Sequence, residues 1–235
     1  MINEILDLSK IEAGRMDMQD VDFNLTALID DLSVMFQLHC EQQGLGWRVD
    51  ALDASSLTVH GDEGKLRGVL INLLSNAVKF TESGEVVLRV SQLAAQRNGE
   101  GVAEREGKEE GFTFEVIATG VGISEEMQAE IFEPFQQGAD ATGQGGTGLG
   151  LAIATKQVQL MGGELAVDSE LGVGSRFFFT VPFAPATQAV ALRSTDTPKQ
   201  VAHLAEEYQV KALIADDVQE NLDLLSMILS DIGVE

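Results

Sequence analysis

The residues best suited to chemistry in this chain form a polar stripe along one predicted helix, "LRGVLINLLSNAVKF" (66–80). At about 100° per residue, one face of this helix is apolar and carries Leu66, Leu70, Leu73, Leu74 and Ala77. A separate narrow stripe carries Gly68, Asn72, Asn76 and Lys79. An Asn carbonyl oxygen can bind Mg²⁺, and a Lys ammonium can hold phosphate. The alternative is that the stripe is only the solvated side of an amphipathic helix.

Two glycine-containing loops could bring backbone close to a ligand. "GQGGTGLGLAI" (143–153) leads from a glycine-rich loop directly into a predicted helix, where backbone N–H groups and the helix dipole favour an anion. It is not a Walker loop, because no Gly-Lys-Ser/Thr follows, and a flexible connection is the alternative. "FEVIATGVGI" (114–123) is a predicted strand that runs into two spaced glycines.

Composition limits the kind of protein and of partner. The chain has 235 residues, enough for one large domain with additional pieces, and 44% of them are hydrophobic, so it can form a core. The formal net charge of −23 disfavours binding to nucleic acid or to anionic membranes. The single cysteine, Cys40, excludes a disulfide framework within the chain. With no apolar run of membrane-spanning length and no signal peptide, we expect a cytoplasmic location, although a full-length protein could be attached to a membrane.

The periodicity predicts a two-layer α+β sandwich. We expect helices at 1–16, 22–44 (capped by Asn24 or Thr26 and ended by Gly44), 62–80 (capped by Asp62), 124–135 (with a Ser124 capping box) and 151–163. We expect strands at "GWRVDA", "SLTVHGD", 84–93, 111–118 and two within 163–183. Residues 184–209 are a predicted linker, and "VKALIADD" (210–217) is a strand that precedes a final helix.

Five motifs occur in an order that resembles the catalytic domain of sensor histidine kinases. They are "NLLSNAVKFT" (72–81), "ATGVGI" (118–123), "FEPF" (132–135), "GTGLGLAI" (146–153) and "SELGVGSRFFFTVP" (169–182). They resemble the asparagine box, first glycine box, phenylalanine box, second glycine box and closing strands of that domain. The resemblance implies the Bergerat-type ATP-binding fold, shared with gyrase, the Hsp90 chaperones and MutL, over about residues 22–183.

The resemblance also implies roles for individual residues. Asn76 would bind Mg²⁺, with Asn72 beside it and Lys79 on the phosphates of ATP. Residues 136–146 would form the lid over ATP. The positions that would contact the nucleotide are Asn72, Asn76, Lys79, Phe80, Ala118, Gly120, Gly122, Ile123, Gly146, Thr147, Gly148, Leu149 and Gly150.

The flanking sequences resemble other parts of a hybrid histidine kinase. "INEILDLSKIEAGRM", within 1–20, resembles the end of the dimerisation domain, and 210–235 resembles the truncated start of a receiver domain, with Asp216 and Asp217 as its acids. The implied partners are ATP, the dimerisation and His-phosphotransfer helix of a longer protein, and a response regulator or receiver in a phosphorelay. The full-length protein would be a homodimer. His39, His60 and His203 lack the sequence pattern of the phosphoacceptor, so we expect no catalytic residue and no autophosphorylation in this chain.

Two residues depart from the family pattern. Position 118 is usually Asp, which accepts a hydrogen bond from the adenine amine, and Ala118 cannot accept one. The loss should cost about 1.5–3 kcal/mol of binding. Position 68 is usually Gln or Glu, and Gly68 should cost the helix about 1 kcal/mol relative to Ala.

Three functions remain open from the sequence. The first is the ATP-binding module of a hybrid histidine kinase, which transfers the γ-phosphoryl group to a His outside this chain. The second is a pseudokinase-like docking or regulatory fragment that binds ATP weakly or not at all, as Ala118 would favour. The third, an ATPase of the gyrase or MutL type, is disfavoured by "FEPF" and by the acidic charge.

Overall fold

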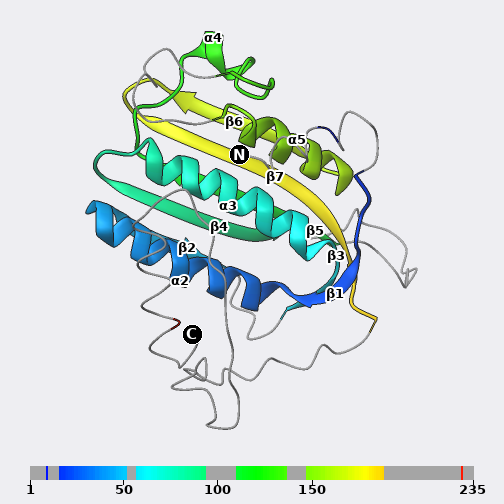
Figure 1. Cartoon of the computed structure of the whole chain (residues 1–235). Helices are drawn as coiled ribbons and strands as arrows, with labels where there is room; N and C mark the ends of the chain where they lie inside the picture. Colours follow the sequence, from blue (N-terminus) through cyan, green and yellow to red (C-terminus); the bar gives the residue numbers. More distant parts are fainter. Residues whose placement is uncertain are drawn as a thin grey trace, which may run out of the picture. The chain divides into compact units, whose positions relative to one another are not determined.

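The computed structural model describes Ser9, residues 16–51, 57–93, 110–136 and 147–187, and Leu229. The chain divides into two units, Met1–Val190 and Ala191–Glu235. All of the helices and strands below belong to the first unit (Figure 1).

A mixed sheet forms one layer of this unit. Its strands are β1 (Val21–Asn24), β2 (Gly46–Asp50), β3 (Thr58–Gly61), β4 (Glu85–Leu93), β5 (Glu110–Ala118), β6 (Glu164–Glu170) and β7 (Gly174–Pro185). The order across the sheet is β1-β3-β7-β5-β4-β2, and β6 pairs with β7 beside β3. Only β2 and β4 are parallel among these pairs. The central strand β7 is therefore flanked by β5 along its length, and by β6 and then β3 on its other edge.

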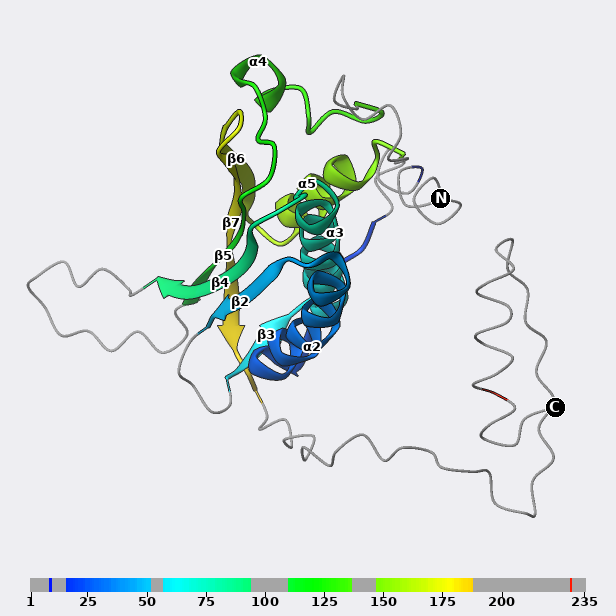
Figure 2. The same cartoon turned by 90° about the vertical axis from the view of Figure 1, so that its left-hand side faces the viewer.

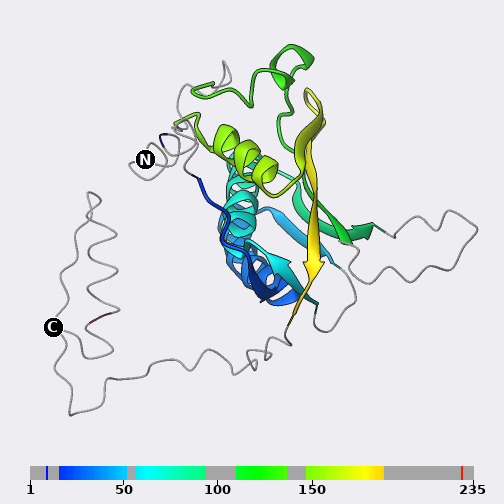
Figure 3. The ribbon, with the colours of Figure 1, turned by 90° about the vertical axis from the view of Figure 1, so that its right-hand side faces the viewer.

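Three helices cover one face of the sheet, as the edge-on views show (Figures 2 and 3). They are α2 (Leu25–Gln43), α3 (Glu63–Lys79) and α5 (Gly150–Leu160). Helix α3 runs between the other two and contacts both of them (Figure 1). The short helix α4 (Glu125–Gln128) lies at the end of β6. These two layers are the predicted α+β sandwich.

The core lies between the helices and the sheet, as the predicted apolar face of α3 requires. Leu66, Leu70, Leu73 and Leu74 are each at most 1% exposed. They face aromatic side chains from the central strands, where Phe114 of β5 stacks on Phe179 of β7 with ring centroids 5.1 Å apart. Burial of this apolar face fixes α3 in rotation, and residues of its polar stripe, Gly68 and Asn72, face α5.

Side-chain caps fix where the two longest helices begin. The Oδ1 of Asn24 accepts a hydrogen bond from the Ala27 N–H at 3.0 Å, and Gly44 ends α2 with a φ of 70°. Asp62 accepts from the Lys65 N–H at 2.9 Å and so caps α3. The predicted caps Asn24 and Asp62 and the glycine stop are confirmed, because capping is a local interaction that spans three or four residues.

A row of alternating charges crosses the helix-free face of the sheet. Arg89 on β4 lies 3.4 Å from Asp50 on β2 and 3.2 Å from Glu115 on β5. Arg176 on β7 also pairs with Glu115, and it donates to Asp168 on β6 at 2.7 Å. Five neighbouring strands thus each contribute one charge to the row, which favours this strand order and register.

Two predictions of local structure were wrong. Residues 22–24, which the sequence placed at the start of the helix 22–44, belong to strand β1 (Val21–Asn24), which pairs with β3. The helix expected at 124–135 has only four helical residues, and the Ser124 side chain makes no capping hydrogen bond. The predicted helix at 1–16, apart from the helical Ser9, lies outside the described residues, as does the receiver-like segment 210–235 apart from Leu229.

Candidate nucleotide-binding site

The asparagine box and the second glycine box meet where α3 crosses the start of α5. Asn76 donates through Nδ2 to Oδ1 of Asn72 at 3.0 Å, so the two half-buried amides are linked. A Cβ at Gly150 would lie only 2.5 Å from Nδ2 of Asn72. Position 150 therefore has room for glycine alone, because any side chain would displace the Asn72 amide.

The start of α5 offers backbone donors beside these amides. The first N–H groups of a helix have no partner within the helix and carry its partial positive charge. Leu149 is 1% exposed and anchors the start of α5, and its N–H donates to Oγ1 of Thr147 at 3.3 Å. An anion placed here would meet both backbone N–H groups and the asparagine amides, as a phosphate group of a nucleotide requires.

The phenylalanine box is tied to the same glycine loop. The Phe135 N–H donates to the carbonyl of Gly148 at 2.9 Å. Gly148 has a φ of 69°, and a Cβ there would lie 2.8 Å from the carbonyl carbon of Phe135. Phe135 itself has a φ of 66° and a side chain that is 68% exposed. The segment after α4 and the loop before α5 therefore form one unit.

The first glycine box closes the other end of the site, beyond the C-terminus of α3. Gly120 packs so closely that a Cβ would lie 2.2 Å from the carbonyl oxygen of Phe80. Gly122 has a φ of 72°, and a Cβ there would lie 2.0 Å from the carbonyl oxygen of Glu170. The Ile123 N–H donates to Oγ of Ser169 at 2.8 Å. The loop is thus held between the end of α3 and the β6–β7 turn.

Ala118, the residue in the place of the family's Asp, ends β5 and faces the helix layer. It pairs across the sheet with Val86 and Ser175 and is 9% exposed. Its methyl group belongs to the same apolar cluster as Val86 and Val116. The side chain at this position is therefore apolar and has no hydrogen-bond acceptor.

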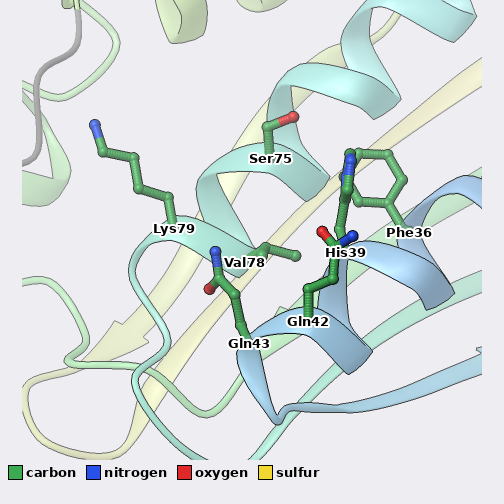
Figure 4. Close-up of a pocket in the computed structure, with 7 residues that line it drawn as sticks. All are labelled: Phe36, His39, Gln42, Gln43, Ser75, Val78 and Lys79. Atoms are coloured by element: carbon green, nitrogen blue, oxygen red, sulfur yellow. The ribbon is translucent and has the colours of Figure 1, made fainter. Parts of the chain in front are cut away.

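Lys79 lies at the end of the polar stripe. Its Nζ is 4.8 Å from the centre of the Phe80 ring, a cation–π contact. In the close-up the Lys79 side chain extends away from the cavity of about 490 Å³ between α2 and α3 that it helps to line (Figure 4). That cavity is lined by Phe36, His39, Gln42, Gln43, Ser75, Val78 and Lys79, and contains neither Asn72 nor Asn76. It is therefore distinct from the amide site.

A metal ion at this site would rely on amide and phosphate oxygens. Among the described residues, no group of three or more His, Cys, Asp or Glu side chains could hold a metal. Because Nδ2 of Asn76 points to Asn72, its carbonyl oxygen is directed away from Asn72. The Asn76 carbonyl oxygen suits Mg²⁺ as a single protein ligand, because Mg²⁺ keeps several waters and binds the phosphate oxygens of a nucleotide. The residues present fit a Mg²⁺–nucleotide complex.

Comparison with known proteins identifies the family. Residues 61–185 match the family described as "Histidine kinase-, DNA gyrase B-, and HSP90-like ATPase". The chain is 37% identical to the sensor histidine kinase AruS of Pseudomonas aeruginosa over 237 residues, which is 99% of this chain and 22% of AruS. The chain belongs to the histidine kinases. The ATP-binding fold and the ATP-binding catalytic module expected from the sequence are confirmed.

Other relatives of this kinase chain agree. It is 31% identical to the sensory/regulatory protein RpfC of Xanthomonas campestris, over 99% of this chain and 34% of RpfC. A structure of full-length ShkA in complex with AMPPNP matches with a TM-score of 0.64 and 26% identity, over all of this chain and 43% of ShkA. The catalytic domain of ThkA matches with a TM-score of 0.53 and 27% identity, over 71% of this chain and 96% of that domain. The kinase chain thus spans about a fifth of the length of AruS and about a third of the length of RpfC.

Several predicted site residues lie in contact, in two separate groups, and others lie outside the described residues. Asn72, Asn76 and Gly150 form one contact group, while Gly120 and Phe80 form a second at the end of α3. Gly146, most of the lid, and the acids Asp216 and Asp217 fall outside the described part of the kinase chain. In that part, no helix combines the length and the apolarity needed to cross a bilayer.

Two residues that contact the candidate site were not predicted from the sequence. Ser169 on β6 holds the first glycine loop through its hydroxyl group. Gln157 on α5 packs against Gly68, one turn of α3 before Asn72. The signal for Gln157 was present, since it follows Gly150 by seven residues and so lies on the same face of α5.

Proposed function

We propose that this chain is the catalytic part of a hybrid sensor histidine kinase, which binds Mg²⁺–ATP and transfers its γ-phosphoryl group to a histidine outside this chain. The contact of Asn72 with Gly150 carries the proposal, because it joins the amides of α3 to the anion-binding start of α5. The AMPPNP complex of the relative ShkA supports the nucleotide class.

The proposed roles follow from the positions of the residues. Backbone N–H groups of 147–150 hold phosphate oxygens, and the first glycine loop, with Gly120, Gly122 and Ile123, receives the base. Asn76 is the proposed Mg²⁺ ligand, with Asn72 orienting it and Lys79 near the phosphates. The bound Mg²⁺ would neutralise charge on the phosphate oxygens during transfer.

The wider architecture is also part of the proposal. Residues 1–20 would end a dimerisation domain, 22–183 would form the catalytic domain, 184–209 a linker and 210–235 the start of a receiver. The partners would be the His-phosphotransfer helix of a dimeric longer protein and a receiver or response regulator, in the cytoplasm. The relatives AruS and RpfC, which match along 99% of this chain, support this arrangement.

The pseudokinase-like alternative rests on Ala118 alone and is not favoured, since the matching relatives carry the names of kinases.

Titration calorimetry with Mg²⁺–ATP tests the proposal that this chain binds ATP. We expect measurable binding, and a loss of at least tenfold in affinity in Asn76→Ala. Ser75→Ala is the matched control, because Ser75 neighbours Asn76 on α3 but lines the separate cavity. Equal effects of the two substitutions, or no binding of ATP by the unmodified chain, would contradict the proposal.

A further inference from the structure

Gly68 interrupts the polar stripe of α3, and a side chain from another helix occupies the space beside it. A Cβ at Gly68 would lie 3.4 Å from Oε1 and 3.7 Å from Nε2 of Gln157. The three heavy atoms nearest to such a Cβ all belong to the Gln157 amide group. The amide group of Gln157 therefore lies where a side chain at 68 would begin.

One face of α5 serves two positions of α3. Gly150 and Gln157 are seven residues apart, close to two full turns, so they point in nearly the same direction. Gly150 lets the helix start approach Asn72, and Gln157 delivers its amide to Gly68 one turn earlier on α3. Together with Asn72 and Asn76, Gln157 completes a row of three amides along the stripe.

The order of contacts along α3 indicates which end of a bound nucleotide would lie nearest to Gln157. The base-side loop, at Gly120, touches the C-terminal end of α3 at Phe80, and the start of α5 touches α3 at Asn72. A nucleotide with its base at the first loop and its phosphates at the start of α5 would run along α3 from Phe80 toward Asn72. Position 68 lies about 6 Å farther along α3 in the same direction, so the Gln157 amide is the next amide beyond Asn72.

We propose that Gln157 is a positioning residue for the terminal phosphoryl group of ATP, which supplies from α5 the polar group that Gly68 does not supply from α3. The inference rests on the proposed ATP site and adds the residue that distinguishes ATP from ADP. An amide suits this task because its NH₂ group donates to a phosphate oxygen without adding charge, while its carbonyl oxygen remains available to a neighbouring donor.

The test measures the affinities of Mg²⁺–ATP and Mg²⁺–ADP by titration calorimetry. In Gln157→Ala the affinity for ATP should fall about fivefold, the size of one hydrogen bond, while the affinity for ADP stays within twofold. Gln157→Met, which keeps the volume of the side chain without its amide, should behave in the same way. The matched control is Gln159→Ala, an exposed glutamine on the same helix, which should change neither affinity.

A double variant tests whether an amide group at this place is sufficient, whichever helix carries it. In Gly68→Gln/Gln157→Ala the amide comes from α3, and the Cβ at 68 fits because the nearest atoms of Gln157 have been removed. We expect the affinity for ATP to return to within twofold of the unmodified chain. A purely structural role of Gln157 would not produce this rescue.

The outcomes separate this inference from the proposed function. If the unmodified chain binds neither nucleotide, both are wrong. If it binds ATP but Gln157→Ala and Gln157→Met weaken ATP and ADP equally, the ATP site stands and the role of Gln157 is overturned. The same conclusion follows if the variants retain full ATP affinity with unchanged thermal unfolding.

Discussion

Ala118 is the proposed base-contacting residue at the position where the family usually carries Asp. We expect Ala118→Asp to tighten Mg²⁺–ATP binding at least tenfold, because a carboxylate can accept the hydrogen bond of the adenine amine. The same substitution should destabilise the ligand-free domain, since the carboxylate replaces a methyl group that is 9% exposed beside Val86 and Val116. Calorimetry with ATP and thermal unfolding without it measure the two opposite effects.

Binding of GTP, which differs from ATP in its base, is the control for this prediction. GTP has no amine at the corresponding position, so Ala118→Asp should not tighten GTP binding, whereas the unmodified chain should discriminate weakly between ATP and GTP. Equal gains for both nucleotides would mean that residue 118 does not face the base.

A substitution at Gly150 tests the close contact between the start of α5 and Asn72. A Cβ at this position would lie 2.5 Å from Nδ2 and 2.9 Å from Oδ1 of Asn72, so Gly150→Ala must shift the Asn72 amide. We expect a loss of at least tenfold in ATP affinity with little loss of stability, because alanine favours the helix by about 1 kcal/mol and offsets part of the clash. Calorimetry and urea unfolding give the two values.

Gly64→Ala is the matched substitution for Gly150→Ala. Gly64 is also helical, and a Cβ there would meet only Asp62 Oδ1, at 3.4 Å. It should leave ATP affinity unchanged. A similar loss in both variants would show that helix substitution in general, rather than contact with Asn72, weakens the site.

At the scale of the element, Asp62 fixes where the site-bearing helix α3 begins. Its carboxylate accepts from the backbone N–H groups of Lys65 and Gln19, at 2.9 and 2.8 Å, and from Nζ of Lys65 at 2.7 Å. Burial alone raises the pKa of Asp62, but these hydrogen bonds and the charge of Lys65 outweigh it and lower the pKa below its ordinary value. The charged form is thus favoured in the folded state.

The lowered pKa gives the pH dependence its sign. A carboxyl with a lowered folded-state pKa contributes full stability above its ordinary pKa, near 4, and loses that contribution as the pH falls through the folded value. We expect Asp62→Asn to lower the free energy of unfolding by about 2 kcal/mol at pH 7, and the difference from the unmodified chain to shrink below about pH 4. Urea unfolding at pH 7 and at pH 3 measures this.

The exposed Asp20 provides the control for Asp62, and Asp20→Asn should have little effect at either pH. A difference between Asp62→Asn and the unmodified chain that stays constant down to pH 3 would mean that the charge of Asp62 does not stabilise the helix start.

The elements also show what could be predicted from sequence and why. Caps at Asn24 and Asp62 were predictable because each acts over three residues. The ordered motifs named both Asn72 and Gly150, which the structure brings into contact. Strand β1 was missed because it depends on pairing with β3, whose residues lie about 37 positions away. The contact of Gln157 with Gly68 depends in the same way on how two helices cross, which local pattern does not determine.

At the scale of the whole molecule, the site joins elements that span most of the domain. Asn72 lies on α3, Gly150 on α5, Ala118 on β5, and the first glycine loop contacts the turn after β6. A ligand that binds only when all of these are in place stabilises the folded state by mass action, by about 2.7 kcal/mol at a hundred times its Kd. For a domain of this size that corresponds to a rise in Tm of about 5–11 °C.

Trp47, the single tryptophan of the chain, reports whether this stabilisation reaches the part of the domain away from the site. It lies on β2, stacks on Phe36 of α2 with ring centroids 6.1 Å apart, and donates to Ser33 at 3.2 Å. We expect its fluorescence transition to shift with Mg²⁺–ATP as much as the circular dichroism transition does, because α2 and α3 share one core. A tryptophan transition that does not move while ATP binds would show that α2 and β2 unfold independently of the nucleotide site.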